Sequence, residues 1–90
     1  MTTKKKQVPA SEDNAVFFYT FDLGLSAALV SAGFSLVSLE RGNLQKTQFV
    51  FRRSDGIDET IDAHWADRLE VKSRTYFDAL KMLKNRLYSE

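Results

Sequence analysis

The sequence predicts an α+β fold: a small, mainly antiparallel three-stranded sheet with helices packed on one face, in the element order βαββαα. Three observations predict it. An aromatic segment precedes an apolar segment of helical period, two alternating segments flank Gly42 and Asn43, and two further segments of helical period follow Gly56. With 90 residues, of which 43% are hydrophobic, the chain can form one core and one domain.

The first strand is predicted over residues 15–20, where aromatic and β-branched side chains follow one another. A helix begins next, because Thr20 or Asp22 can cap its first turn. It ends at Gly33, since glycine suits the left-handed position after a helix. The apolar positions of this helix are Leu25, Ala28, Leu29 and Ala32, and the positions expected to face outward are Ser26 and Ser31.

Residues 34–41 and 46–53 are predicted to form a hairpin, because both segments alternate and Gly42 and Asn43 are typical turn residues. In the first of these strands, one face is expected to hold Phe34, Leu36 and Ser38, and the other Val37 and Leu39.

In the second strand, Phe49 and Phe51 point to the same side and are expected in the core. Gln48, Val50 and Arg52 would then face the other way, on a partly basic open side of the sheet. The crossover helix could place the first strand beside the third.

Two helices are predicted to complete the domain after the breaker at residues 54–56. The first has an apolar stripe, with acidic side chains lying away from it. Ser73 is the expected cap of the second. The stripe of the first helix is Ile57, Ile61, His64 and Trp65, and the apolar face of the second is Tyr76, Phe77, Leu80, Leu83 and Leu87.

Residues 1–14 are predicted to be a disordered N-terminal tail, because they are polar, contain Pro9 and show no apolar period. The domain is expected over residues 15–90. No apolar stretch approaches the roughly 18 to 20 residues that a membrane-spanning helix needs. There are no cysteines, which excludes disulfides and thiolate sites. A cytoplasmic protein without membrane contact is the resulting prediction.

Enzymatic chemistry is not expected from these residues. His64 is the single histidine, and the chain has no phosphate-binding glycine loop and no nucleophile motif. His64 could hold a metal ion with Asp67 or Glu70, but an ordinary helix surface is the favoured interpretation. We therefore predict no catalytic residue, no metal site and no cofactor.

Charge is distributed unevenly along the chain, although the net charge is +1. Residues 54–71 carry six acidic side chains and one arginine, and residues 72–90 carry five basic and two acidic ones. The candidate nucleic-acid-binding residues are Arg52, Arg53, Arg74, Lys81 and Lys84. The candidate protein-binding residues are Asp58, Glu59 and Asp62 on the acidic helix.

Several segments together resemble a family of short uncharacterised α+β domains found in bacterial and phage genomes. The resemblance covers roughly residues 16–88. It rests on a strand ending in Thr20-Phe21-Asp22-Leu23, a helix ending in Gly33-Phe34, the Phe49-Val50-Phe51 strand, and the segment from Tyr76 to Tyr88. It implies a compact fold and a phage or mobile-element setting, and it supplies no active-site residues.

Three functional hypotheses remain open. The leading one is a small non-enzymatic binding or adaptor module that contacts a protein partner through its surface. The second is a nucleic-acid-binding accessory protein that uses the basic residues. The third is a phage inhibitor of a host protein, in which the acidic helix imitates nucleic acid. An open sheet edge or an exposed apolar helix surface would also allow a homodimer.

Overall fold

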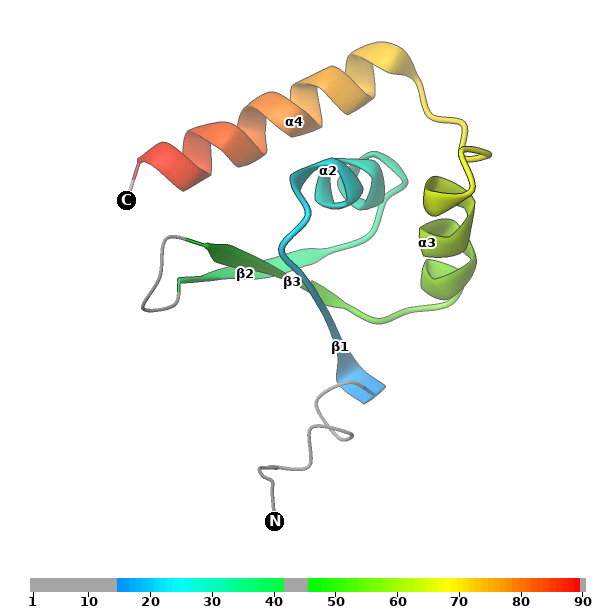
Figure 1. Cartoon of the computed structure of the whole chain (residues 1–90), viewed down its shortest axis with the longest axis horizontal. Coiled ribbons are helices and arrows are strands. Elements are labelled where there is room, and N and C mark those ends of the chain that lie inside the picture. Colours follow the sequence, from blue (N-terminus) through cyan, green and yellow to red (C-terminus); the bar gives the residue numbers. More distant parts are fainter. Residues whose placement is uncertain (1–14, 42–45, 90) are drawn as a thin grey trace.

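The structure is a computed structural model that describes residues 15–41 and 46–89 (Figure 1). It confirms the α+β fold and the predicted order βαββαα. The tail at residues 1–14 and the turn at Gly42 and Asn43 lie outside the described residues. The elements are β1 (Phe17–Thr20), α2 (Leu23–Ser31), β2 (Leu36–Arg41), β3 (Thr47–Arg52), α3 (Ile57–Trp65) and α4 (Ser73–Tyr88).

The three strands form one antiparallel sheet in the order β1-β3-β2. Because β3 runs antiparallel to both neighbours, β1 and β2 run parallel to each other, and α2 connects them across the central strand. The prediction that the first strand lies beside the third is therefore confirmed. The β2–β3 hairpin is confirmed by its pairing.

Residues that pair directly across strands share a face of the sheet, so the register assigns each side chain to one of two faces. Phe18 pairs with Phe51, and Thr20 pairs with Phe49, on the face that the helices cover. The opposite face, which we call the outer sheet face, consists of Phe17, Tyr19, Ser38, Glu40, Gln48, Val50 and Arg52.

A register shift lies in β2 between Leu36 and Ser38. Leu36 pairs with Phe51 and Leu39 pairs with Phe49, so both leucines lie on the core face, and Val37 is exposed. The prediction that Leu39 lies opposite Leu36 was therefore wrong. An irregularity of this kind adds a residue to one strand and shifts the alternation of its side chains by one position.

Helix α2 begins at the predicted cap, because Oδ1 of Asp22 accepts a 2.7 Å hydrogen bond from the backbone nitrogen of Leu25. It is followed by Gly33 in the left-handed region, with φ 99°. Ser26 is fully buried, so the prediction that it faces outward was wrong. Its hydroxyl donates a 2.8 Å hydrogen bond to the backbone oxygen of Asp22, so the buried oxygen keeps a partner.

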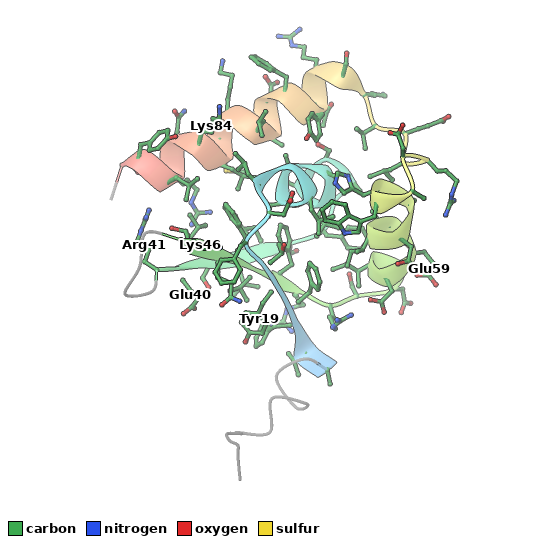
Figure 2. The ribbon with its side chains drawn as sticks, in the orientation of Figure 1. Tyr19, Glu40, Arg41, Lys46, Glu59 and Lys84 are labelled. Carbon is green, nitrogen blue, oxygen red and sulfur yellow. The ribbon has the colours of Figure 1, made fainter. Side chains whose placement is uncertain are left out.

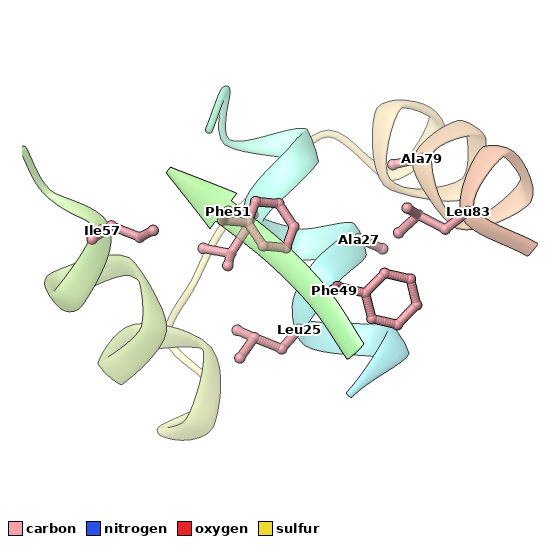
Figure 3. Packing of buried hydrophobic residues seen from close by; sticks show 8 residues of the cluster. Leu25, Ala27, Phe49, Phe51, Ile57, Ala79 and Leu83 are labelled. Carbon is pink, nitrogen blue, oxygen red and sulfur yellow. The ribbon is translucent and has the colours of Figure 1, made fainter. Parts of the chain in front are cut away.

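The core lies between β3 and the three helices, and Figure 3 shows its side chains meeting there. In Figure 1, α2 lies between the sheet and α4, and α3 lies beside α2. A helix in this position is buried on more than one side, which explains its nearly continuous apolar sequence. The buried cluster consists of Leu25, Ala27, Leu29, Phe49, Phe51, Ile57, Ala79 and Leu83.

Helix α4 differs from its prediction in two respects. Lys72 occupies the cap position, Ser73 is already the first helical residue, and no side chain caps this end. The helix turns Ala79 and Leu83 into the core and leaves Phe77 exposed. The predicted apolar face was therefore correct for Leu83 and wrong for Phe77.

Candidate interaction surfaces

The predicted basic residues do not gather on one surface, because Arg52 and Arg53 point to opposite sides of the sheet. Arg52 lies on the outer sheet face, with its guanidinium carbon 5.7 Å from the ring centroid of Phe17. Arg53 turns the other way, with its guanidinium carbon 5.6 Å from the ring centroid of Phe18. Its Nη1 lies 2.8 Å from Oδ1 of Asp58, so this basic candidate is paired with an acidic one.

The other three basic candidates lie on α4, on the side that faces away from α2. Lys84 is exposed, and Figure 2 labels it on α4. Positions three or four apart on a helix share a face, and two exposed aromatic side chains occur among these bases. We call this surface the outer α4 face, and its residues are Arg74, Phe77, Lys81, Lys84 and Tyr88.

The aromatic side chains of the outer α4 face are unusually exposed. Phe77 is 56% exposed and Tyr88 is 80% exposed, and Nζ of Lys81 lies 5.4 Å from the ring centroid of Phe77. The helical period of the sequence predicts Phe77 in the core and assigns no role to Tyr88. The spacing of Phe77, Lys81, Lys84 and Tyr88, at i, i+4, i+7 and i+11, was the signal that could have identified this face.

A second surface of opposite charge lies on α3. Asp58, Glu59 and Asp62 are all exposed, as the predicted acidic helix requires, and Figure 2 shows Glu59 pointing away from the domain. Trp65, predicted in the apolar stripe, is 60% exposed and follows Asp62 by three positions on the helix, and its ring meets that of His64 edge-on with centroids 4.8 Å apart. We call Asp58, Glu59, Asp62 and Trp65 the outer α3 face.

His64 is half-buried and lines a hollow of about 210 Å³ beside α2 and α4. Asp67 lines the same hollow and adopts a left-handed backbone conformation, with φ 60°. Within residues 15–41 and 46–89, no group of three histidine, cysteine, aspartate or glutamate side chains is placed to hold a metal ion.

A third feature lies where the hairpin meets the end of α4. Nη2 of Arg41 donates hydrogen bonds to the backbone oxygens of Arg86 and Leu87, at 3.2 and 2.9 Å. Arg41 thereby satisfies carbonyl groups at the negative end of the helix dipole. The exposed ring of Phe21 lies nearby, in a hollow of about 210 Å³ that Arg41 and Tyr88 also line.

In the described part of the chain, no helix combines the length and apolar character needed to cross a membrane. Comparison with curated proteins gives no match, and comparison with solved structures gives none either. A family model described as a domain of unknown function, DUF5659, matches residues 15–89. This match spans every helix and strand described above, and the chain belongs to the DUF5659 family of domains of unknown function.

Proposed function

We propose that the protein is a small, non-enzymatic binding module that contacts a macromolecular partner through the outer α4 face. The observation that carries this proposal is the exposure of Phe77 and Tyr88 among basic side chains of one helix. Soluble proteins commonly keep exposed aromatic patches at interaction sites. Aromatic residues also dominate the binding energy of many interfaces.

The charge of this face indicates the kind of partner. Arg74, Lys81 and Lys84 contribute three positive charges, and Asp78 is the acidic residue among them on α4. A surface of this sign attracts an anionic partner before contact and speeds association. The predicted protein partner would therefore present an acidic surface to α4.

The non-enzymatic part of the proposal is supported by the side-chain chemistry of the sequence. The chain has no cysteine nucleophile and a single histidine, His64, which leaves few of the common nucleophile and base pairs. The exposed groups instead suit recognition by contact and charge.

The test is capture of partners from an extract of the organism that encodes the chain, with three immobilised proteins compared. One is the wild type, and one carries Phe77→Ala, Lys81→Glu and Lys84→Glu on the outer α4 face. The third carries Lys46→Glu and Arg52→Glu, which reverse two charges away from that face. The proposal expects partners retained by the wild type and by this control and lost by the α4 variant. Equal retention by all three would reject the α4 face as the contact surface.

A second candidate, nucleic-acid binding, is favoured by one specific observation, the packing of Lys81 over the exposed ring of Phe77. Proteins that bind single strands combine aromatic rings, on which bases stack, with cations that contact phosphates. Three of the five predicted residues, Arg74, Lys81 and Lys84, lie on this surface. Arg52 and Arg53 do not.

Fluorescence anisotropy with labelled single-stranded and duplex oligonucleotides tests this candidate. Each phosphate contact removed should reduce the slope of log K against log salt by about 0.7 to 0.9. Lys81→Ala and Lys84→Ala should each reduce the slope by about that amount, and Arg52→Ala should leave it unchanged. Absence of binding at about 50 mM salt would end the nucleic-acid proposal, because the phosphate contribution is large at that ionic strength.

A further inference from the structure

We propose that the outer α3 face of one copy docks on the outer α4 face of a second copy, so that the protein associates head-to-tail with itself. This inference does not depend on the proposed function. It concerns two helix faces of one molecule that have opposite charge and that each carry an exposed aromatic side chain.

The two faces are complementary in charge. Residues 54–71 contain six acidic side chains and one arginine, and residues 72–89 contain five basic side chains and one acidic one. Glu59 and Asp62 are exposed on α3, and Lys81 and Lys84 are exposed on α4. Faces of opposite charge attract each other over about one Debye length, and faces of the same charge repel each other.

The aromatic side chains supply the apolar part of the contact. Trp65 lies three positions after Asp62 on α3, and Phe77 and Tyr88 lie among the bases of α4. Each of the three rings is more than half exposed. Tryptophan and tyrosine are the side chains most often found as energetic centres of interfaces. Each face therefore combines charge with a ring that loses contact with water when covered.

The two faces cannot neutralise each other within one copy. In Figure 2, Lys84 on α4 and Glu59 on α3 lie on different sides of the domain, and both side chains are exposed. A second copy can bring them together. A two-fold pairing of α4 with α4 would bring like charges together, so the favoured contact joins an α3 face to an α4 face. In a pair of copies, one α4 face and one α3 face then remain uncovered. Such a contact extends into a chain or closes into a ring.

The contact would also cover the face that the proposed function assigns to an external partner. Self-association and partner binding would then compete, so the apparent affinity for the partner would fall as the protein concentration rises. Self-association is measured without any partner present, so its failure is distinguishable from failure of the proposed function.

Trp65 provides a local probe, because it is the single tryptophan of the chain and lies on the outer α3 face. Its emission is recorded against protein concentration at low and high salt, together with the mass in solution by sedimentation velocity. Raising the salt from about 0.01 M to about 1 M shortens the Debye length from about 30 Å to about 3 Å. We expect a shift of the emission to shorter wavelength with concentration at low salt, and its loss at high salt.

Charge reversal identifies the two faces. The first variant carries Glu59→Lys and Asp62→Lys, and the second carries Lys81→Glu and Lys84→Glu. Asp58 is kept because it pairs with Arg53. Each variant alone has two faces of like charge and should remain monomeric. An equimolar mixture should associate again, because each face then meets its complement in the other variant.

Circular dichroism first confirms that both variants fold, and the Lys46→Glu and Arg52→Glu protein serves as the control with the same change in net charge as the second variant. The control should associate like the wild type. The proposal is overturned if the wild type stays monomeric at low salt, or if the mixture stays monomeric while the wild type associates. Association of either folded variant alone would also overturn it.

Discussion

Nη1 of Arg53 donates a 2.8 Å hydrogen bond to Oδ1 of Asp58, which connects the residue after β3 with the first turn of α3. The sequence marked these two residues as members of different binding surfaces. In the folded domain the two opposite charges partly neutralise each other, and the guanidinium of Arg53 also lies over the ring of Phe18. This pair therefore links the end of β3 to the first turn of α3.

The Arg53–Asp58 pair should contribute a small coupling free energy. The Asp58 side chain is 72% exposed and the Arg53 side chain 28%, so solvent screens the interaction. A double-mutant cycle of Arg53→Ala and Asp58→Ala, measured by urea unfolding, should give a coupling of about 0.5 to 1 kcal/mol. The coupling should shrink in 1 M salt. A coupling of zero at low salt would contradict the pairing.

Loss of the α2 cap should destabilise the domain. Asp22→Ala removes the acceptor of the Leu25 backbone nitrogen and should lower the free energy of unfolding by about 1 kcal/mol. Asp22→Ser should restore most of this, because serine can accept the same bond. Thermal unfolding of the three proteins measures both effects. If serine rescued no better than alanine, the cap would not be the cause.

Asp67 should tolerate glycine better than alanine. It follows α3 with φ 60°, and the backbone nitrogen of Arg68 donates to the oxygen of Ala63 across this turn. Glycine adopts this conformation without a Cβ penalty, so Asp67→Gly should raise the free energy of unfolding by about 0.5 to 1 kcal/mol. Asp67→Ala should not raise it. Chemical denaturation of both variants checks the order, and an equal effect of the two would contradict it.

Substitutions at two positions of α4, one on the core side and one on the outer side, should differ in their effect on the free energy of unfolding. Leu83 is fully buried, and Leu83→Ala should lower the free energy of unfolding by about 2 to 5 kcal/mol. Phe77 is largely exposed, so Phe77→Ala should change it by about 0.5 kcal/mol or less. Denaturant unfolding provides both values. Comparable losses would mean that Phe77 packs in the core, as the sequence pattern first indicated.

The order of elements was predictable because each has a local signal. Asp22 and Gly33 bound α2, and alternating residues on either side of a turn indicate the hairpin. The register of β2 was not predictable, because its irregularity depends on pairing with β3. Two residues of one face, Leu36 and Leu39, have the wrong sequence spacing for a regular strand.

The candidate surfaces were predictable in part. The acids of α3 and the bases of α4 are exposed where the charge pattern indicated. Their aromatic neighbours were not identified, because an apolar stripe does not reveal which of its members face the core. Phe77 is adjacent to the stripe through Tyr76 and Leu83, and only the packing of α4 on α2 turns it outward.

The order of the strands determines when this domain can form during synthesis. β1 pairs with β3 and not with β2, so Phe17–Thr20 has no strand partner until Thr47–Arg52 has emerged from the ribosome. Contacts between distant segments slow folding. The aromatic first strand is consequently available to chaperones, or to other nascent chains, while residues 21–52 are being synthesised.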